Sequence, residues 1–266
     1  NASAMEVQEL KDNNGVDAML EIGLPGGYGF YGVADVLSGA ANPSGHLADT
    51  YVVTNANAPS AQNYGDNEWT NANSDINMNS ELVEAENIYI GYKYYETRYA
   101  DTVLGQGNAS DSVGSSTGKA WNYDDEVTYP FGYGLSYTTF TQTLDELNVD
   151  TNQNTVTAKV TVTNTGDVAG KDVVQLYASA PYTDYDKQHG VEKSAIQLLD
   201  YGKTKELAPG ASETVTITTD LQNLASWDST ADNAIGTKGC YILDAGDYYF
   251  TIGNGAHEAV NNVLAA

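Results

Sequence analysis

The stretch Tyr129–Phe140 reads YPFGYGLSYTTF and divides the chain into two parts with different patterns. Before it, apolar segments of strand and helix character alternate, and after it the apolar residues follow the every-second-residue spacing of β-strands. The whole chain has 266 residues, which is enough for two ordinary domains. We therefore place a domain boundary here, with one domain over residues 1–140 and a second over residues 141–266.

The second part has the pattern of an all-β domain. Val156, Ala158, Val160 and Val162 alternate with threonine and lysine, which predicts a half-buried strand. Further strand-like segments follow at residues 173–177, 215–217 and 248–252. Turn residues at 209–210 and 245–247 separate them. Several short alternating strands separated by turns are typical of an immunoglobulin-like or fibronectin-III-like β-sandwich.

The first part has the pattern of an α/β layer. Residues 17–22 (DAMLEI) predict a buried strand, and the apolar run at residues 30–37, closed by Gly39, predicts a helix with a glycine C-cap. Residues 88–98 fit either a strand or an aromatic-rich helix-to-strand entry. Residues 54–80 are rich in asparagine with little apolar periodicity, which predicts a long surface loop.

The composition narrows the possible partners. Lysine and arginine total 11 against 36 aspartate and glutamate residues, which gives a formal net charge of -25. Nucleic acid and anionic membranes are excluded as partners because both need clustered positive charge, whereas a neutral sugar is unaffected. Cys240 is the only cysteine, so no disulfide forms within the chain. The sequence names no compartment, and a bacterial cytoplasmic or a secreted location both stay open.

Several blocks of the chain together resemble glycoside hydrolase family 3, the β-glucosidase family. The stretch at 129–140 resembles that family's PFGYGLSYT signature, and ENIYIGYKYYET at 86–97 resembles a second family segment. Further similar blocks are Pro25-Gly26, ADVLSG at 34–39, NPSG at 42–45, residues 162–177, Glu192-Lys193 and LAPGAS at 207–212. One departure is His46-Leu47-Ala48 after NPSG, where many members carry Arg and then Leu-Pro.

The resemblance implies a multidomain fold of α/β and all-β parts. Residues 1–140 would be the C-terminal part of the family's α/β sandwich domain, and residues 141–266 a fibronectin-III-like β-sandwich with a C-terminal tail. The tail, residues 253–266, resembles a branch of the family in which the catalytic TIM barrel follows these two domains.

The resemblance also implies a function for the parent protein. Family members are retaining glycosidases, which use two carboxyl groups about 5 to 5.5 Å apart, and the expected reaction is hydrolysis of terminal β-linked glucose or a related sugar. The aspartate nucleophile is expected in a TIM barrel on the same parent chain or a companion chain, and the acid/base glutamate in a segment before this one. No residue of this chain is therefore assigned a catalytic role, and the chain alone is expected to be inactive.

Four residues of the asparagine-rich loop are the candidates for contact with an oligosaccharide or β-glucoside substrate. They are Asn63, Tyr64, Asp66 and Trp69, an aromatic pair with hydrogen-bonding companions in a loop long enough to overhang a neighbouring barrel. The alternative is a mobile surface loop without contact to sugar.

The remaining polar residues favour structural roles. For Glu86 and Glu96, structural hydrogen bonding is favoured over acid/base work, and Asp124, Asp125 and Glu126 predict a solvated acidic turn. Asp184 and Asp186 have a calcium-loop spacing without the other ligands, which predicts a polar loop. The three histidines are scattered, so no metal and no cofactor is predicted.

Two other classes of function stay open for the chain by itself. A carbohydrate-binding or adhesive module is favoured by its 20 tyrosines and its fibronectin-like half. A structural module, in which the β-sandwich stabilises the parent or forms a homodimer contact, needs no substrate at all.

Overall fold

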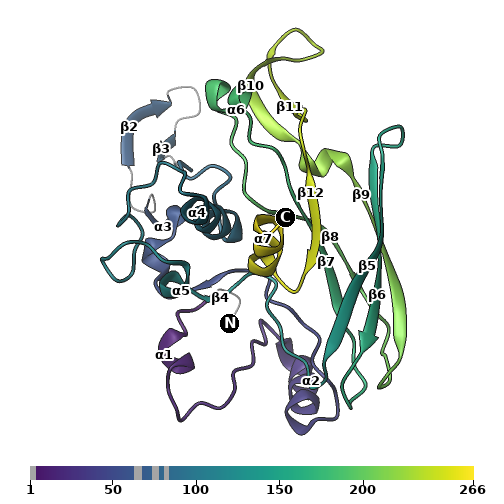
Figure 1. Ribbon diagram of the computed structural model, residues 1–266. Helices are drawn as coiled ribbons and strands as arrows, with labels where there is room; N and C mark the ends of the chain where they lie inside the picture. Colours follow the sequence, from purple (N-terminus) through teal and green to yellow (C-terminus); the bar gives the residue numbers. More distant parts are fainter. Residues whose placement is uncertain (1–3, 63–67, 74–77, 81–83) are drawn as a thin grey trace.

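The computed structural model describes residues 4–62, 68–73, 78–80 and 84–266, and of residues 68–73 and 78–80 it describes the backbone alone. A β-sandwich formed by the C-terminal half stands beside an α/β part formed by the N-terminal half (Figure 1). Helix α7 (Ala256–Leu264), at the end of the chain, lies between the two parts.

The β-sandwich consists of two three-stranded antiparallel sheets. One has the order β5 (Phe140–Asp150), β6 (Thr155–Asn164), β9 (Ser212–Asp220). The other has the order β12 (Tyr249–Gly253), β7 (Val173–Ser179), β8 (Gln197–Lys203). The predicted β-sandwich is therefore confirmed.

Strand β6 shows why this half folds as a sandwich. Its valines and alanine are fully buried and share one core cluster with Val174 and Leu176 of β7. The threonines between them point outward and pair across the sheet, with Thr157 and Thr218 hydroxyls 3.0 Å apart and Thr163 and Ser212 hydroxyls 2.7 Å apart. The alternation predicted from the sequence thus separates a dry core from a hydroxylated outer surface.

A hairpin and two short helices extend this half beyond the two sheets. The hairpin pairs β10 (Ser226–Asp232) with β11 (Lys238–Ile242), and η2 (Leu221–Leu224) precedes it. Helix α6 (Asp184–His189) lies against β10.

The N-terminal half has longer irregular segments between its elements. Its helices are α1 (Gln8–Lys11), α2 (Gly26–Ser38), η1 (Asn55–Asn57), α3 (Pro59–Gln62), α4 (Tyr92–Leu104) and α5 (Tyr123–Glu126). Its strand pairs are β1 (Tyr51–Val52) with β4 (Val127–Tyr129), and β2 (Glu68–Asn73) with β3 (Met78–Ser80). In the described part of the chain, no helix is long and apolar enough to cross a membrane.

Three predictions for this half have different outcomes. The helix ending at Gly39 is confirmed as α2, and Gly39 has the left-handed backbone of a C-cap at φ 77°. The strand predicted at residues 17–22 is wrong, because no other strand among the described residues pairs with this segment and Met19, Leu20 and Ile22 are exposed. The loop predicted at 54–80 is also wrong in part, since it contains η1, α3, β2 and β3.

The two halves share a common core. Ala256, Ala259 and Val260 of α7 are buried against Ala100 of α4 and Tyr177 of β7. Helix α4 belongs to the N-terminal half and β7 to the sandwich, so α7 joins the two. Buried apolar contacts of this kind hold two domains in a fixed orientation.

The stretch 129–140 connects the halves and contacts both. Gly132 has φ +83°, a backbone conformation that favours glycine, and its N–H donates to the Leu47 carbonyl at 2.8 Å. Phe131 packs on Tyr92 of α4 with ring centroids 4.6 Å apart. The Tyr137 hydroxyl donates to the Val36 carbonyl of α2 at 2.8 Å.

Candidate functional site

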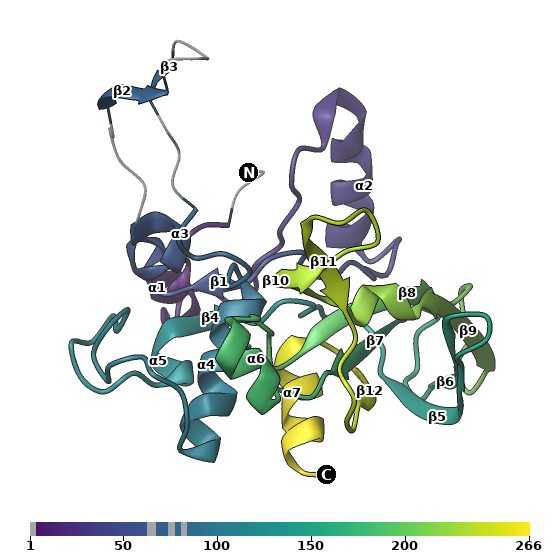
Figure 2. The same ribbon diagram turned by 90° about the horizontal axis from the view of Figure 1, so that it is seen from above.

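The four residues predicted to contact sugar lie at the margin of what the structure describes. Asn63, Tyr64 and Asp66 lie outside the described residues, and Trp69 belongs to β2, of which only the backbone is described. Strands β2 and β3 lie apart from the rest of the chain (Figure 2). The role of these four residues stays a prediction.

A cavity of about 460 Å³ opens in the N-terminal half, next to the helix that precedes this hairpin. Its lining includes Asp49, Thr50, Asn55, Ser60, Ile90 and Tyr95. The Thr50 hydroxyl is buried beside the cavity and has no hydrogen-bond partner within the described residues. Hydroxyl, amide and carboxylate groups beside apolar side chains suit a neutral polyhydroxylated molecule.

The structure indicates the orientation of the Asp49 carboxylate and the protonation state of the Tyr95 hydroxyl, which both line the cavity. The Asp49 carboxylate accepts the backbone N–H of Thr50 at 2.8 Å, which orients it at the rim. Burial raises the pKa of Tyr95, so its hydroxyl stays protonated and neutral at physiological pH. These groups can bind and orient a sugar hydroxyl by hydrogen bonding.

Glu96 lies outside this cavity, in a buried cluster between α4, α5 and α7. Its carboxylate accepts a hydrogen bond from the Tyr123 hydroxyl at 2.5 Å, and the Nδ1 atom of His257 lies 2.9 Å from its other oxygen. A carboxylate only accepts, so the His257 ring carries a proton on Nδ1. Burial, and then the Glu96 charge, raises the pKa of Tyr123 and keeps that phenol a donor. One oxygen of Glu96 thus bonds to α5 and the other to α7, which is the structural role favoured by the sequence.

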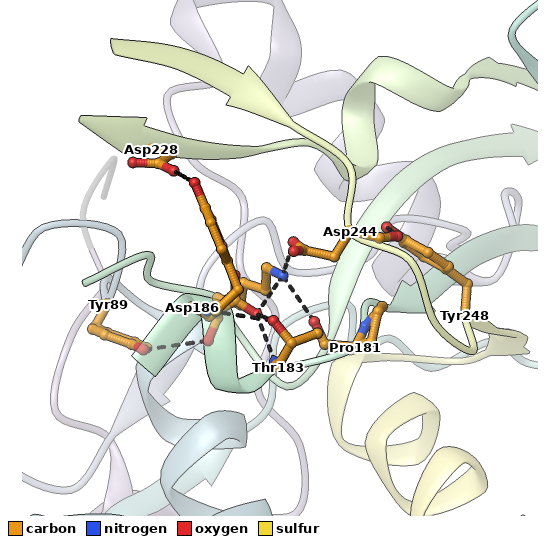
Figure 3. Close-up of polar contacts among 9 residues, drawn as sticks. Tyr89, Pro181, Thr183, Asp186, Asp228, Asp244 and Tyr248 are labelled. Carbon is orange, nitrogen blue, oxygen red and sulfur yellow. Dashed lines mark hydrogen bonds and ion pairs between the residues drawn. The ribbon is translucent and has the colours of Figure 1, made fainter. Parts of the chain in front are cut away.

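A second buried cluster surrounds Lys193 and is drawn in Figure 3. The Lys193 ammonium donates to the Pro181 carbonyl at 2.8 Å, to Asp186 at 2.8 Å and to Asp244 at 2.5 Å. Asp186 also accepts from the backbone N–H and hydroxyl of Thr183 at 2.6 and 2.9 Å. The polar loop predicted at Asp184 and Asp186 is therefore wrong: the segment is α6, and Asp186 closes a capping box at its start.

The charges of this cluster are compensated. Burial pushes the pKa of Asp186 up, but the hydrogen bonds from Lys193 and Thr183 outweigh it and hold that pKa below its usual range. Burial likewise pushes the pKa of Lys193 down, and the bonds to Asp186 and Asp244 raise it overall. Both groups stay charged and paired at neutral pH, so the cluster fastens α6 to the loop before β12.

The solvated acidic turn predicted at residues 124–126 is wrong for one of its members. Glu126 is buried, and its two oxygens accept the backbone N–H and the hydroxyl of Ser116, each at 2.6 Å. Asp124 and Asp125 are exposed in α5. Across the described ranges, no three histidine, cysteine, aspartate or glutamate side chains are grouped as metal ligands.

The sequence singles out Asp186 and Lys193 but does not predict that they cluster with Asp244, which lies far from them in the sequence. The Thr183-to-Asp186 spacing resembles a capping box and is the one local pattern that indicates a helix start there. Nothing local indicates that Lys193 meets Asp244, because that contact depends on how the strands pack.

Two family descriptions match the chain over distinct ranges. Residues 1–137 match the glycosyl hydrolase family 3 C-terminal domain, and residues 172–256 match the fibronectin type III-like domain. An α/β part joined to a sandwich of this type is one region of a multidomain glycosidase architecture. The chain belongs to glycoside hydrolase family 3.

Its relatives carry consistent names. Beta-glucosidase A of Butyrivibrio fibrisolvens is 31% identical over 94% of this chain and 26% of its own length. The beta-glucosidase of Ruminococcus albus is 32% identical over 91% of this chain and 21% of its own length. The chain thus spans about a quarter of the curated relatives it matches.

Solved structures show the same likeness. The structure of beta-glucosidase 3B from Thermotoga neapolitana in complex with glycerol matches 96% of this chain with a TM-score of 0.67 and 30% identity, over 29% of its own length. A beta-glucosidase from Paenibacillus barengoltzii matches 85% of this chain with a TM-score of 0.62 and 34% identity, over 20% of its own length.

Proposed function

We propose that this chain is part of a retaining β-glucosidase that hydrolyses terminal β-linked glucose or a related sugar. The observation that carries the proposal is the alignment coverage. Relatives named beta-glucosidase align with almost all of this chain, and the aligned part is about a quarter of each relative's length. In this proposal the chain supplies supporting domains, and the nucleophile belongs to a TIM barrel on the same parent chain or a companion chain.

The exposed apolar surface of α2 supports a role as part of a larger assembly. Tyr28 is 88% exposed, Tyr31 73% and Leu37 72%, and Leu24 just before the helix is 79% exposed. No residue of α2 is buried within the described part of the chain. A helix with this much exposed apolar surface normally packs against something else. In the proposal, the remaining part of the parent covers it.

We further propose that Asn63, Tyr64, Asp66 and Trp69 line the substrate site of the parent. The cavity at Thr50, whose hydroxyl has no hydrogen-bond partner among the described residues, supports this, because it adjoins the start of the same segment. Trp69→Ala in the full parent should raise KM for a β-glucoside more than it lowers kcat. Tyr201→Ala, an exposed tyrosine on β8, is the matched control and should leave both constants unchanged.

The function itself is tested with the full-length parent. Incubated with neutral β-linked gluco-oligosaccharides, it should release glucose from the non-reducing end, and the anomeric proton spectrum should show the β-anomer first. Release of the α-anomer first, or no release from any β-linked glucoside, would refute the proposal.

A purely structural role for the β-sandwich is the second candidate, and the core shared by α7, α4 and β7 favours it. Deleting residues 141–266 from the parent separates the two roles. A lower melting temperature with unchanged kcat and KM at low temperature supports the structural role, whereas a changed KM supports substrate lining. Light scattering of the parent, before and after the deletion, tests whether the sandwich forms a homodimer contact.

A further inference from the structure

The hairpin β10–β11 presents two exposed aromatic rings that the proposed function does not use. Trp227 is 51% exposed and Tyr241 is 63% exposed, and the two are directly opposite each other across the hairpin. Their ring centroids are 5.2 Å apart and their planes meet at 69°. We call this pair the aromatic corner.

The aromatic corner is held in place from the other side of the hairpin. Asp228, next to Trp227, is fully buried and accepts the Tyr185 hydroxyl of α6 at 2.6 Å (Figure 3). The same carboxylate accepts the backbone N–H of Thr230 at 2.7 Å and its hydroxyl at 2.8 Å. The pKa of Asp228 is lowered, mainly by the hydrogen bond from Tyr185, so this carboxylate stays ionised at neutral pH. The hairpin is therefore anchored to α6.

Trp227 itself lies against bare backbone. A Cβ atom added to Gly239 would lie 2.5 Å from the Trp227 ring, and Gly239 has φ +95°. The ring thus packs on the glycine of the opposite strand. A ring that contacts the backbone on one side has fewer rotamers to lose when it binds a ligand, which lowers the entropy cost of binding.

We propose that the aromatic corner is a binding site for a neutral oligosaccharide, whose apolar C–H face stacks on Trp227 while Tyr241 borders it. The exposed area of the two rings is roughly 200 Å², taken as about half of what two aromatic side chains bury when fully covered. A stable protein interface needs about 800 Å² on each partner, so the two rings by themselves offer less than a protein partner needs and enough for a sugar ring.

Charge points to the same class of ligand. The chain has a formal net charge of -25, which disfavours anionic polymers. At the hairpin tip, Lys238 pairs with Asp232 at 2.7 Å, so the nearby ammonium is already compensated. An uncharged ligand with an apolar face and hydroxyl groups has no charge to desolvate there. This site goes beyond the proposed function, since binding at it requires no catalytic barrel.

The experiment uses the 266-residue chain in affinity gel electrophoresis and in NMR titration with neutral β-linked gluco-oligosaccharides. We expect saturable binding in the millimolar range by the wild-type chain. Trp227→Ala and Tyr241→Ala should each weaken it by about tenfold, a cost typical of losing an aromatic anchor. Trp227→Phe keeps a smaller ring and should give an intermediate affinity. Tyr201→Ala removes an equally exposed tyrosine from β8 and should have no effect.

The outcomes decide between the alternatives. Near-ultraviolet circular dichroism of each variant checks that the fold is retained, and Trp227→Phe provides a test if the alanine variant unfolds. The proposal is overturned if the wild-type chain shows no saturable binding at millimolar sugar. Equal binding by wild type, Trp227→Ala and Tyr241→Ala also overturns it. A concentration-dependent dimer that requires Trp227 would show instead that the corner is a protein contact, and would likewise overturn it.

Discussion

Replacing Lys193 with methionine is expected to destabilise the chain strongly. The Lys193 side chain is 6% exposed, and its ammonium is paired with Asp186, which is fully buried, and with Asp244, whose side chain is 10% exposed. The substitution keeps the volume of the side chain but leaves two carboxylates without their cation. Breaking a buried ion pair by removing one partner costs about 3–5 kcal/mol of unfolding free energy.

Urea unfolding at several pH values measures this cost. In the wild type the pKa of Asp186 lies below its unfolded value, so this carboxylate contributes stability above about pH 4 and loses it as pH falls through the folded pKa. Without Lys193 we expect burial to outweigh the two remaining hydrogen bonds from Thr183 and to raise the pKa of Asp186 above the unfolded value. Protonation of Asp186 should therefore stabilise the variant as the pH falls. The difference in unfolding free energy between wild type and variant should shrink between pH 7 and about pH 4.

Lys159→Met is the matched control. Lys159 pairs with Glu146 at 2.7 Å, but the two side chains are 45% and 53% exposed, so the change should cost less than about 1 kcal/mol at any pH. If Lys193→Met costs no more than Lys159→Met, or if its deficit is the same at both pH values, the description of a compensated buried cluster is refuted.

Further predictions concern the core, the connection and the last helix. Leu176→Ala in the sandwich core should lower the unfolding free energy by about 2–5 kcal/mol in urea, and a loss below about 1 kcal/mol would contradict its burial. Gly132→Ala should cost more than about 1 kcal/mol at φ +83°, whereas an unchanged urea midpoint would show that this backbone is not required. Glu96→Leu removes the acceptor of Tyr123 and His257 and should speed amide hydrogen exchange in α7, read by mass spectrometry with β6 as internal reference.

The sandwich and α2 were predictable because their determinants are local. The valine and threonine alternation of β6 fixes which face is buried, and Gly39 supplies the left-handed C-cap that ends α2. The segment at residues 17–22 has an equally apolar pattern, yet a strand also needs a hydrogen-bonded neighbour. A pattern within one segment carries no information on whether that neighbour is present.

The polar clusters were not predictable because they depend on tertiary contacts. Lys193 meets both Asp186 and Asp244 only after α6 folds back on the loop before β12, and His257 meets Glu96 across 161 positions of sequence. The burial of Glu126 has the same origin, since its partner Ser116 is brought close by the path of the loop before α5. The cavity beside Thr50 depends on three separate segments and has no local sequence pattern.

Glucose release by the 266-residue chain alone is the most direct test of the central claim, that the chain supports a catalytic site without containing its nucleophile. The chain and its full-length parent are assayed at equal molarity with the same β-glucoside. The parent should release glucose, and the chain should release none above the buffer blank. Release by the chain at a rate comparable to that of the parent would contradict the claim.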